Sequence, residues 1–134
     1  MEEIKKQGME SLFCPYEQAL SLKELGFDEP CFGCYDEKAV FGLTVMSIKQ
    51  YYTNSKEDTW NCAAPLYQQA FRWFRKKYGL YFSIQYFQYD EWCLQITTKK
   101  EDTVFNYKST DGFKTYEEAE LACLIKLIEI VKNK

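Results

Sequence analysis

The clearest structural signal in this chain reads Pro65-Leu66-Tyr67-Gln68-Gln69-Ala70-Phe71-Arg72-Trp73-Phe74-Arg75-Lys76-Lys77-Tyr78-Gly79. Its apolar residues recur at the spacing of one helix face, and its polar and basic residues fill the opposite face. Pro65 suits the start of a helix, where no amide donor is needed, and Gly79 suits the position after its end. The pattern therefore predicts an amphipathic helix over residues 66–78.

The segment before this helix predicts a shorter helix followed by a hairpin. Pro15 opens the short helix, and Gly26 ends it. Residues 31–35 and 40–49 are apolar, partly alternating runs on either side of a polar turn, which favours two antiparallel strands. A short polar connector, residues 53–59, then leads to the central helix.

The segment after the central helix predicts a second hairpin and a last helix. Residues 81–89 and 92–98 read as two strands, and residues 103–108 read as a fifth strand. Thr115 precedes the last helix, and Glu118 stands three residues later, which is the spacing of a capping box. The helix that follows is apolar on most of its sides, so we expect it to be the most buried one.

These elements predict an α+β fold with the order α-β-β-α-β-β-β-α. Hairpin connections make the sheet antiparallel, and the helices then cover one of its faces, which gives two layers. The chain has 134 residues, a length typical of one domain. We therefore expect a single domain over residues 1–134, with an ordered core from 12 to 134 and frayed residues at 1–11.

Short motifs recur along the chain in the same order. Tyr16-Glu17-Gln18-Ala19 recurs as Tyr67-Gln68-Gln69-Ala70, and Tyr35-Asp36-Glu37 recurs as Tyr89-Asp90-Glu91. An internal αββ duplication explains this order and predicts that both Tyr-Asp-Glu tripeptides lie in hairpin turns. The alternative is that Tyr-x-x-Ala is simply a common helix opening, in which case the element order still stands because it rests on periodicity.

Composition argues against several functional classes. The net charge is -3, from 17 basic and 20 acidic residues, and no apolar run is long enough for a transmembrane helix. The start of the chain lacks the apolar core of a signal peptide, so we expect a cytoplasmic protein with no membrane partner. The chain has no histidine, which removes imidazole bases, imidazole metal ligands and Ser-His or Cys-His pairs. We therefore expect no enzyme, no catalytic residue and no cofactor.

The string Cys31-Phe32-Gly33-Cys34 is the one motif with an obvious chemical interpretation. A Cys-x-x-Cys motif is typical of redox-active thiols or of half a zinc site. A zinc site needs two more ligands, and the chain has neither a histidine nor a second such motif. We therefore interpret Cys31 and Cys34 as ordinary cysteines of a strand, without metal and without an obligatory disulfide.

Three strings resemble a known family. They are Cys14-Pro15-Tyr16-Glu17-Gln18-Ala19, Ala64-Pro65-Leu66-Tyr67-Gln68-Gln69-Ala70-Phe71-Arg72-Trp73-Phe74-Arg75-Lys76-Lys77-Tyr78-Gly79-Leu80 and Phe113-Lys114-Thr115-Tyr116-Glu117-Glu118-Ala119-Glu120-Leu121-Ala122-Cys123-Leu124. They are similar to a family of small phage and prophage proteins of gut anaerobes, from about residue 12 to the end. The resemblance implies a phage-encoded accessory protein that acts in the host cytoplasm, and it carries over no catalytic residue.

Residues 66–131 also resemble a double-stranded RNA-binding domain, in element order alone. That family grips phosphates with lysines at the start of its last helix. Here the same place holds Glu117, Glu118 and Glu120, which suit the helix dipole and repel a phosphate backbone. The resemblance therefore implies a topology and not an RNA-binding site.

The central helix carries the first candidate surface. Arg72, Arg75 and Lys76 share its polar side with no acid among them, which is typical of a surface that binds nucleic acid or an acidic protein. The alternative is a merely solvated face, because the rings of the helix fall on the core side. We expect these three bases to be exposed and the aromatic residues of the helix to be buried.

Aromatic residues beside the polar connector form the second candidate surface. Tyr51, Tyr52 and Trp60 flank the connector, where exposed rings suit a protein interface. The alternative is that these rings fold back over the sheet edge. The leading hypothesis is a small non-enzymatic binding protein with a protein partner of unknown identity. The runner-up is a nucleic-acid-binding module that uses the basic face of helix 66–78.

Overall fold

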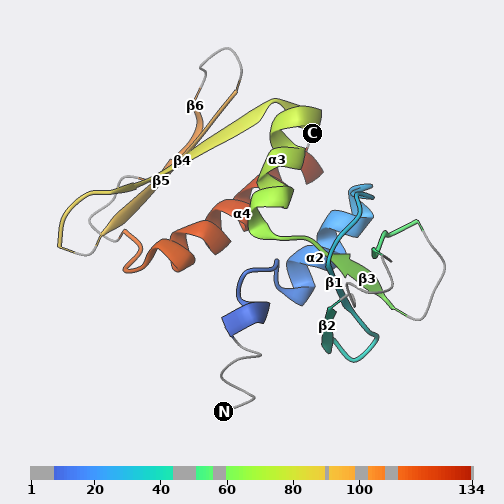
Figure 1. Ribbon diagram of the computed structural model, residues 1–134. Coiled ribbons are helices and arrows are strands. Elements are labelled where there is room, and N and C mark those ends of the chain that lie inside the picture. The colour runs from blue at the N-terminus through green and yellow to red at the C-terminus, as the bar shows by residue number, and fades with distance from the viewer. Residues whose placement is uncertain are drawn as a thin grey trace. The chain divides into compact units, whose positions relative to one another are not determined.

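The computed structural model describes residues 8–43, 51–55, 60–89, 91–98, 103–107 and 112–133 (Figure 1). The elements follow in the order α2 (Tyr16–Glu24), β1 (Gly33–Tyr35), β2 (Phe41–Leu43), β3 (Cys62–Ala64), α3 (Tyr67–Tyr78), β4 (Leu80–Tyr86), β5 (Trp92–Thr98), β6 (Thr103–Tyr107) and α4 (Tyr116–Lys132). The pairs within each sheet of this part of the chain are antiparallel. The predicted antiparallel α+β fold is confirmed.

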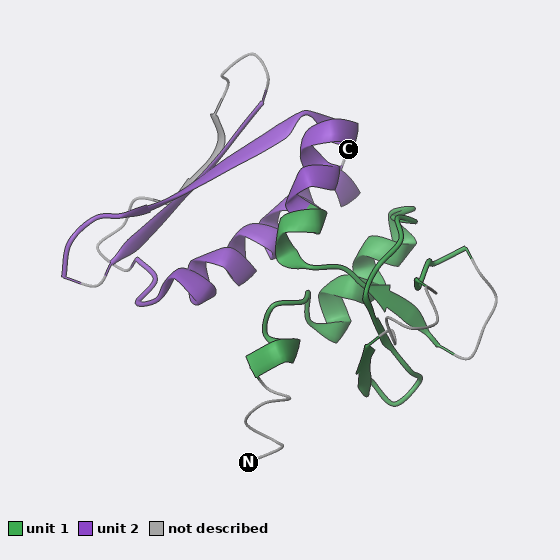
Figure 2. Ribbon diagram, in the orientation of Figure 1, with its two compact units in different colours: residues 1–70 green, residues 71–134 purple. Residues whose placement is uncertain are grey.

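The chain divides into two compact units, unit 1 (residues 1–70) and unit 2 (residues 71–134) (Figure 2). The strands of the described residues accordingly form two sheets of three strands each, with the orders β2-β1-β3 and β4-β5-β6, in place of the single sheet that was expected. Strand β3 was not predicted, because Cys62, Ala63 and Ala64 are all small and show no alternation along the chain. The expectation that the two units act as one domain stays a prediction.

The predicted ends of the first two helices are confirmed by the backbone. Helix α2 follows Pro15 and ends with Leu25 as its C-cap. The next residue, Gly26, has φ 97°, and Gly79 after α3 has φ 64°. Both values lie in the left-handed region, where a side chain is disfavoured, so each glycine lets the chain leave its helix without strain.

Strand β1 is the centre of the first sheet and supplies much of the core of unit 1. Tyr35 lies opposite Phe41 on one side and opposite Cys62 on the other. These three side chains are buried together with Phe13 and Ala19 of the preceding segment. The buried hydroxyl of Tyr35 donates a hydrogen bond to the backbone carbonyl oxygen of Cys14, just before α2, at 2.7 Å. The sheet and the N-terminal helix are thus joined by one apolar cluster.

The predicted first hairpin is present, with shorter strands than expected. The predicted strand over 31–35 begins at Gly33, and Cys31 instead forms an isolated bridge with Tyr52. The predicted strand over 40–49 is seen at residues 41–43; Val40 precedes the strand, and residues 44–49 lie outside the described residues. At the chain start, residues 8–10 form a helical turn, and the rest of the segment predicted to fray lies outside the described residues apart from Ser11.

Unit 2 is a meander of three strands with helices against its inner face. Leu94 and Ile96 of β5 are fully buried, and the register places them opposite Ile84 and Phe82 of β4. The ring of Phe71, in α3, lies 4.3 Å from the ring of Phe82, centre to centre. Helix α4 packs along β4 and β5 through one buried side, which consists of Ala119, Cys123, Leu124, Leu127, Ile128 and Val131. The predicted layer of helices on one face of a sheet is therefore seen in this unit.

The N-terminus of α4 carries the predicted capping motif. The side chain of Thr115 accepts a hydrogen bond from the backbone N–H of Glu118 at 3.1 Å. The Glu118 carboxylate accepts in turn from the N–H of Lys114 at 3.1 Å, one residue earlier than in the ideal capping box. One backbone donor of the first helical turn and one donor just before the N-cap are thereby satisfied.

The described residues of both Tyr-Asp-Glu tripeptides lie at hairpin turns, but they occupy them differently. Tyr35 is the last residue of β1, whereas Tyr89 lies inside the second turn with φ 52°. Asp90 lies outside the described residues. The strands following α2 and α3 also differ, since β1 is the central strand of its sheet and β4 is an edge strand. The αββ order recurs in the two units, whereas the sheet topology does not.

Candidate interaction surfaces

Helix α3 divides into a buried aromatic side and a basic side, as predicted. Phe71, Trp73 and Phe74 are buried, with exposed fractions of 0, 6 and 0%. Arg72 and Lys76 are exposed as predicted, whereas Arg75 was expected to be exposed and is half-buried; the three lie at i, i+3 and i+4 on one side of the helix. None of the three bases forms an ion pair with a carboxylate in the part of the chain that the structure describes. They are therefore open to an anionic partner.

Part of the positive charge of α3 has a local structural role. Three bases lie in its last turn, Arg75, Lys76 and Lys77, where the negative end of the helix dipole favours cations. The Lys77 ammonium lies 5.1 Å from the centre of the Trp73 ring and 5.6 Å from that of Tyr78. This geometry is a cation–π contact, so the charge of Lys77 already interacts with rings of its own helix.

The three aromatic residues beside the polar connector do not form one surface. Tyr52 exchanges two backbone hydrogen bonds with Cys31, at 2.8 and 2.9 Å, and its ring lies edge-on to Trp60 with centres 4.7 Å apart. The Trp60 indole donates a hydrogen bond to the carbonyl oxygen of Thr53 at 3.2 Å. Tyr52 and Trp60 are half-buried, so these two rings follow the folded-back alternative.

Tyr51 is the exposed member of the group, and the structure gives it a neighbour that the sequence analysis did not single out. Its side chain is 46% exposed and lies edge-on to the ring of Phe32, which is 43% exposed, at 5.6 Å between centres. Phe32 is the second residue of the Cys-x-x-Cys motif.

The most exposed aromatic residues of the described chain lie at the β4–β5 turn, and the sequence analysis missed them. Tyr86, Phe87 and Tyr89 are 55, 65 and 87% exposed. The prediction ran the strand to residue 89, whereas β4 ends at Tyr86, so the following rings lie in the turn. Three aromatic residues within four positions, next to the polar pair Asp90-Glu91, were the signal that could have identified them.

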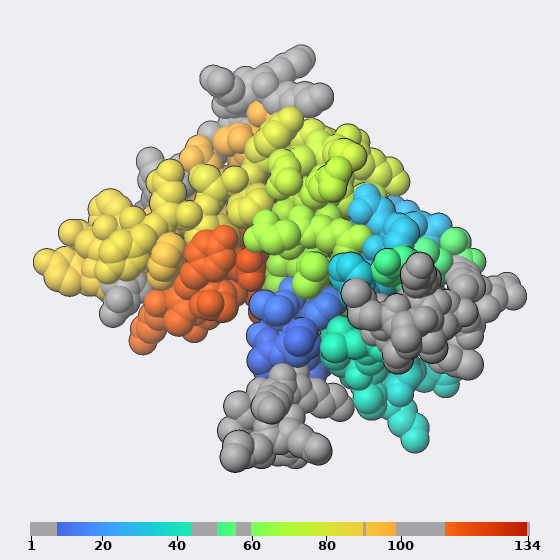
Figure 3. Space-filling model, in the orientation of Figure 1, coloured from blue at the N-terminus to red at the C-terminus, as the bar shows by residue number. Residues whose placement is uncertain are grey.

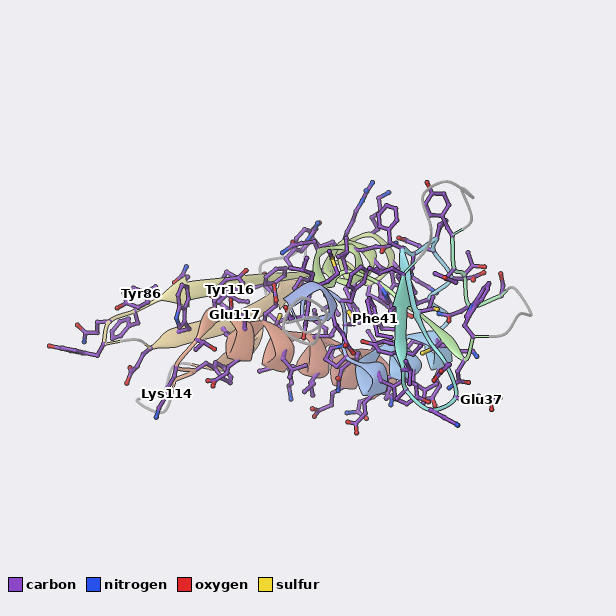
Figure 4. All side chains as sticks on the ribbon, turned by 60° about the horizontal axis from the view of Figure 1, so that its bottom comes forward. Glu37, Phe41, Tyr86, Lys114, Tyr116 and Glu117 are labelled. Atoms are coloured by element: carbon purple, nitrogen blue, oxygen red, sulfur yellow. The ribbon has the colours of Figure 1, made fainter. Side chains whose placement is uncertain are left out.

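Tyr86, the last residue of β4, is held by two further aromatic side chains. Tyr86 lies edge-on to Trp92 with ring centres 5.2 Å apart, and Trp92 lies edge-on to Tyr116 at 5.4 Å. Figure 4 labels Tyr86 near the end of the hairpin, and Figure 3 shows that hairpin, in yellow, at the surface. Phe87 and Tyr89 follow Tyr86 in the chain and are more exposed than it is. We name these three residues, Tyr86, Phe87 and Tyr89, the turn cluster.

Three thiols of unit 1, those of Cys31, Cys34 and Cys62, are held in their protonated form. Burial, followed by the nearby charges of Glu29 and Asp28, raises the pKa of Cys31 from 9.0 to about 12. Burial also raises the pKa of Cys62 to about 11 and raises that of Cys34. A thiol reacts and binds metals as the thiolate, so these groups are poorly suited to either task at neutral pH. Among the described residues, no three Cys, Asp or Glu side chains are grouped to hold a metal ion.

No helix among the described residues is both long and apolar enough to cross a membrane.

Comparisons with known proteins give the chain no relative. No family model, no curated protein and no solved structure matches the chain.

Proposed function

We propose that this chain is a small non-enzymatic interaction protein that binds a partner protein through exposed aromatic side chains. The observation that carries the proposal is the turn cluster, in which Phe87 is 65% and Tyr89 is 87% exposed. Large apolar rings at the surface are typical of interaction sites, and Tyr and Trp are enriched among the residues that dominate binding energy. Tyr51 and Phe32 form a second, smaller aromatic surface of the same kind.

The rest of the proposal comes from chemistry and resemblance. The chain has no histidine, and burial keeps the Cys31 thiol protonated. Both features support a binding role over a catalytic one. The strings similar to phage and prophage proteins support a phage-encoded accessory protein acting in the host cytoplasm. The partner would then be a host or phage protein.

The proposal is tested by capture of partners from lysogenic host cells with the tagged full chain. The variant Phe87→Ala/Tyr89→Ala should lose the captured partner by at least about tenfold, because truncating a central interface ring costs about 2 kcal/mol or more. It should keep the wild-type melting temperature, since both rings are exposed. Val40→Ala, at an apolar residue that is 48% exposed elsewhere, is the matched control and should retain the partner.

Equal capture by the wild type and the double variant would contradict the assignment of the turn cluster. A parallel Tyr51→Ala variant then asks whether the surface formed with Phe32 makes the contact. If neither variant changes the captured set, the aromatic surfaces are not the binding sites.

The second candidate function is nucleic-acid binding through Arg72, Arg75 and Lys76. The supporting observation is that these three neighbouring cations form no ion pair within the described residues. The acidic start of α4, with Glu117 and Glu118, weighs against a phosphate contact there. The basic side of α3 is therefore the surface to test.

Fluorescence anisotropy with labelled single- and double-stranded RNA and DNA, at two salt concentrations, tests this candidate. Replacing Arg72, Arg75 and Lys76 with Gln should weaken binding and reduce the salt slope by about one for each phosphate that the variant no longer neutralises. Lys38→Gln, at an exposed lysine of the first hairpin turn, is the control. Wild-type protein that shows no salt-dependent binding would exclude this function.

A further inference from the structure

Strand β4 is an edge strand without the usual protection of an edge. The sheet order β4-β5-β6 places it at one side of its sheet. Residues 80–89 read Leu-Tyr-Phe-Ser-Ile-Gln-Tyr-Phe-Gln-Tyr, with no charge, no proline and no glycine. Natural edge strands are usually kept from pairing with another chain by charges, proline, bulges or short length. A seven-residue, uncharged and regular edge strand is therefore ready to pair.

The other edge of the same sheet has the protection that β4 lacks. Strand β6 has five residues, and its register against β5 shifts between Ile96 and Thr97. In the sequence it is preceded by the charged stretch 99–102 and followed by Lys108. By contrast, β4 pairs with β5 without any shift from residue 80 to 86. The difference marks β4 as the edge open to a further strand.

The hairpin hydrogen bonds show which backbone groups of β4 face outward. Phe87 donates its N–H to the carbonyl oxygen of Glu91 at 2.8 Å, so this opposing pair is hydrogen-bonded within the hairpin. Trp92 exchanges its backbone bonds with Phe113, at 2.7 and 3.1 Å, and so points away from β4. Because bonding alternates along an antiparallel pair, the odd-numbered residues of β4 bond to β5 and the even-numbered ones face the open edge.

Phe82 and Ile84 are the central residues of that open edge. Their backbone N–H and C=O groups find no partner on this side within the part of the chain that the structure describes. Two donors and two acceptors thus stand in a row at the spacing of a ladder. A strand that pairs here satisfies all four.

We propose that two copies of this chain pair through β4, antiparallel, about a two-fold axis at Ser83. In this register Phe82 of one copy lies opposite Ile84 of the second copy, and the same pair forms again on the other side of the axis. The backbone N–H and C=O groups of both residues point toward the open edge, so the two residues form a hydrogen-bonded pair. An aromatic ring opposite a β-branched side chain is also a favourable cross-strand pair. Tyr81 then lies opposite Gln85. The turn cluster rings Phe87 and Tyr89 stay outside the paired stretch.

A second copy is the occupant that the edge fits best. The strand is complementary to itself in the register above, which an isologous two-fold contact requires. Each copy carries a net charge of -3, so two copies repel unless they meet along an uncharged stretch, and residues 80–89 provide one. Pairing makes one continuous sheet of six strands and removes an unprotected edge from each copy. This inference does not rest on the proposed function.

Sedimentation equilibrium of the full chain, from about 5 to about 500 µM, tests the pairing over the range expected of a small interface. The wild type should shift with concentration from 16.0 kDa toward twice that mass. Ser83→Lys places two like charges face to face at the axis and should weaken the dimer at least about tenfold. Gln95→Lys is the matched control, because Gln95 lies opposite Ser83 on the same sheet face but in the central strand.

Amide hydrogen exchange on the wild type locates the contact and does not depend on a variant that folds. The amides of Phe82 and Ile84 should become protected as concentration rises, whereas the amide of Phe87, already bonded to Glu91, should not change. A chain that stays monomeric throughout overturns the proposal. So does a dimer in which the Phe82 and Ile84 amides stay unprotected, or one that both lysine variants weaken equally, since that result places the contact on the sheet face.

Discussion

Gly33 is expected to be the strand glycine of unit 1 that tolerates an added methyl group least well. A Cβ atom there would lie 2.8 and 3.1 Å from two atoms of the Phe41 ring and 3.2 Å from the ring of Phe13. Both rings are buried, and their centres lie 4.9 Å apart, so neither has room to move away. Gly33→Ala should therefore introduce an overpacking cost of about 1–3 kcal/mol.

Gly42 supplies an internal reference for this cost. It lies in the neighbouring strand, and a Cβ there would meet only the Sγ atom of Cys34, at an ordinary 3.6 Å. Neither Gly33 nor Gly42 has a positive φ, so replacing either by alanine gains about 0.4–1 kcal/mol from the unfolded chain. This gain cancels in the comparison. The two alanine variants should differ in free energy of unfolding by the overpacking cost alone, about 1–3 kcal/mol.

Urea denaturation of the two variants, with the slope m checked for constancy, measures the difference. Adding Phe41→Leu to Gly33→Ala should recover part of the loss, because a smaller side chain then faces the new methyl group. The double variant should be more stable than the sum of the single changes by about 0.5–3 kcal/mol. Alanine variants that agree within about 0.5 kcal/mol would refute the packing described for Gly33.

Other side chains give three more tests. Phe74→Ala, which empties a fully buried position, should lower the free energy of unfolding by about 3–5 kcal/mol, and a loss near zero would contradict its burial. Thr115→Ala should cost about 0.5–2 kcal/mol through removal of the cap, whereas Thr115→Ser should stay close to wild type; equal losses would exclude the capping role. Burial raises the pKa of Cys31 from 9.0 to about 12 and the pKa of Cys62 from 9.0 to about 11. The folded protein therefore holds both thiol protons more tightly than the unfolded chain does. The stability that this difference contributes is complete below about pH 9 and is lost as the pH rises through the two raised pKa values. Melting temperatures should therefore fall between about pH 9 and pH 11, and less steeply in Cys31→Ala; equal slopes would refute this role.

The helices were predictable because their signals are local. Pro15 with Gly26 and Thr115 with Glu118 mark helix ends within a few residues of the periodic pattern that they bound. Strand β3 gave no such signal, because it pairs with β1, which lies far away in the sequence. Its existence depends on pairing with Tyr35 and its neighbours, which no window around residues 62–64 contains.

The candidate surfaces were predictable only where exposure follows from periodicity. Arg72 and Lys76 of α3 are exposed because the opposite side of the same helix is aromatic, a relation visible within twelve residues. Tyr52 and Trp60 are half-buried because distant groups hold their segment, as when Asn54 donates to the carbonyl oxygen of Phe27 at 2.7 Å and accepts from the N–H of Ala63 at 2.8 Å. The sequence near residue 54 shows neither partner.

The border between the two units falls between Ala70 and Phe71, inside helix α3. A fragment that starts at Phe71 would keep eight of the twelve helical residues, and isolated helices shorter than about 12–15 residues are marginal in water. Proteases cut at exposed, weakly bonded chain, so limited digestion is expected to spare this border even though the units are compact by themselves. Anyone who wishes to separate the halves for spectroscopy or crystallisation should therefore begin the second fragment at Pro65, where the chain enters the helix, and not where the units divide.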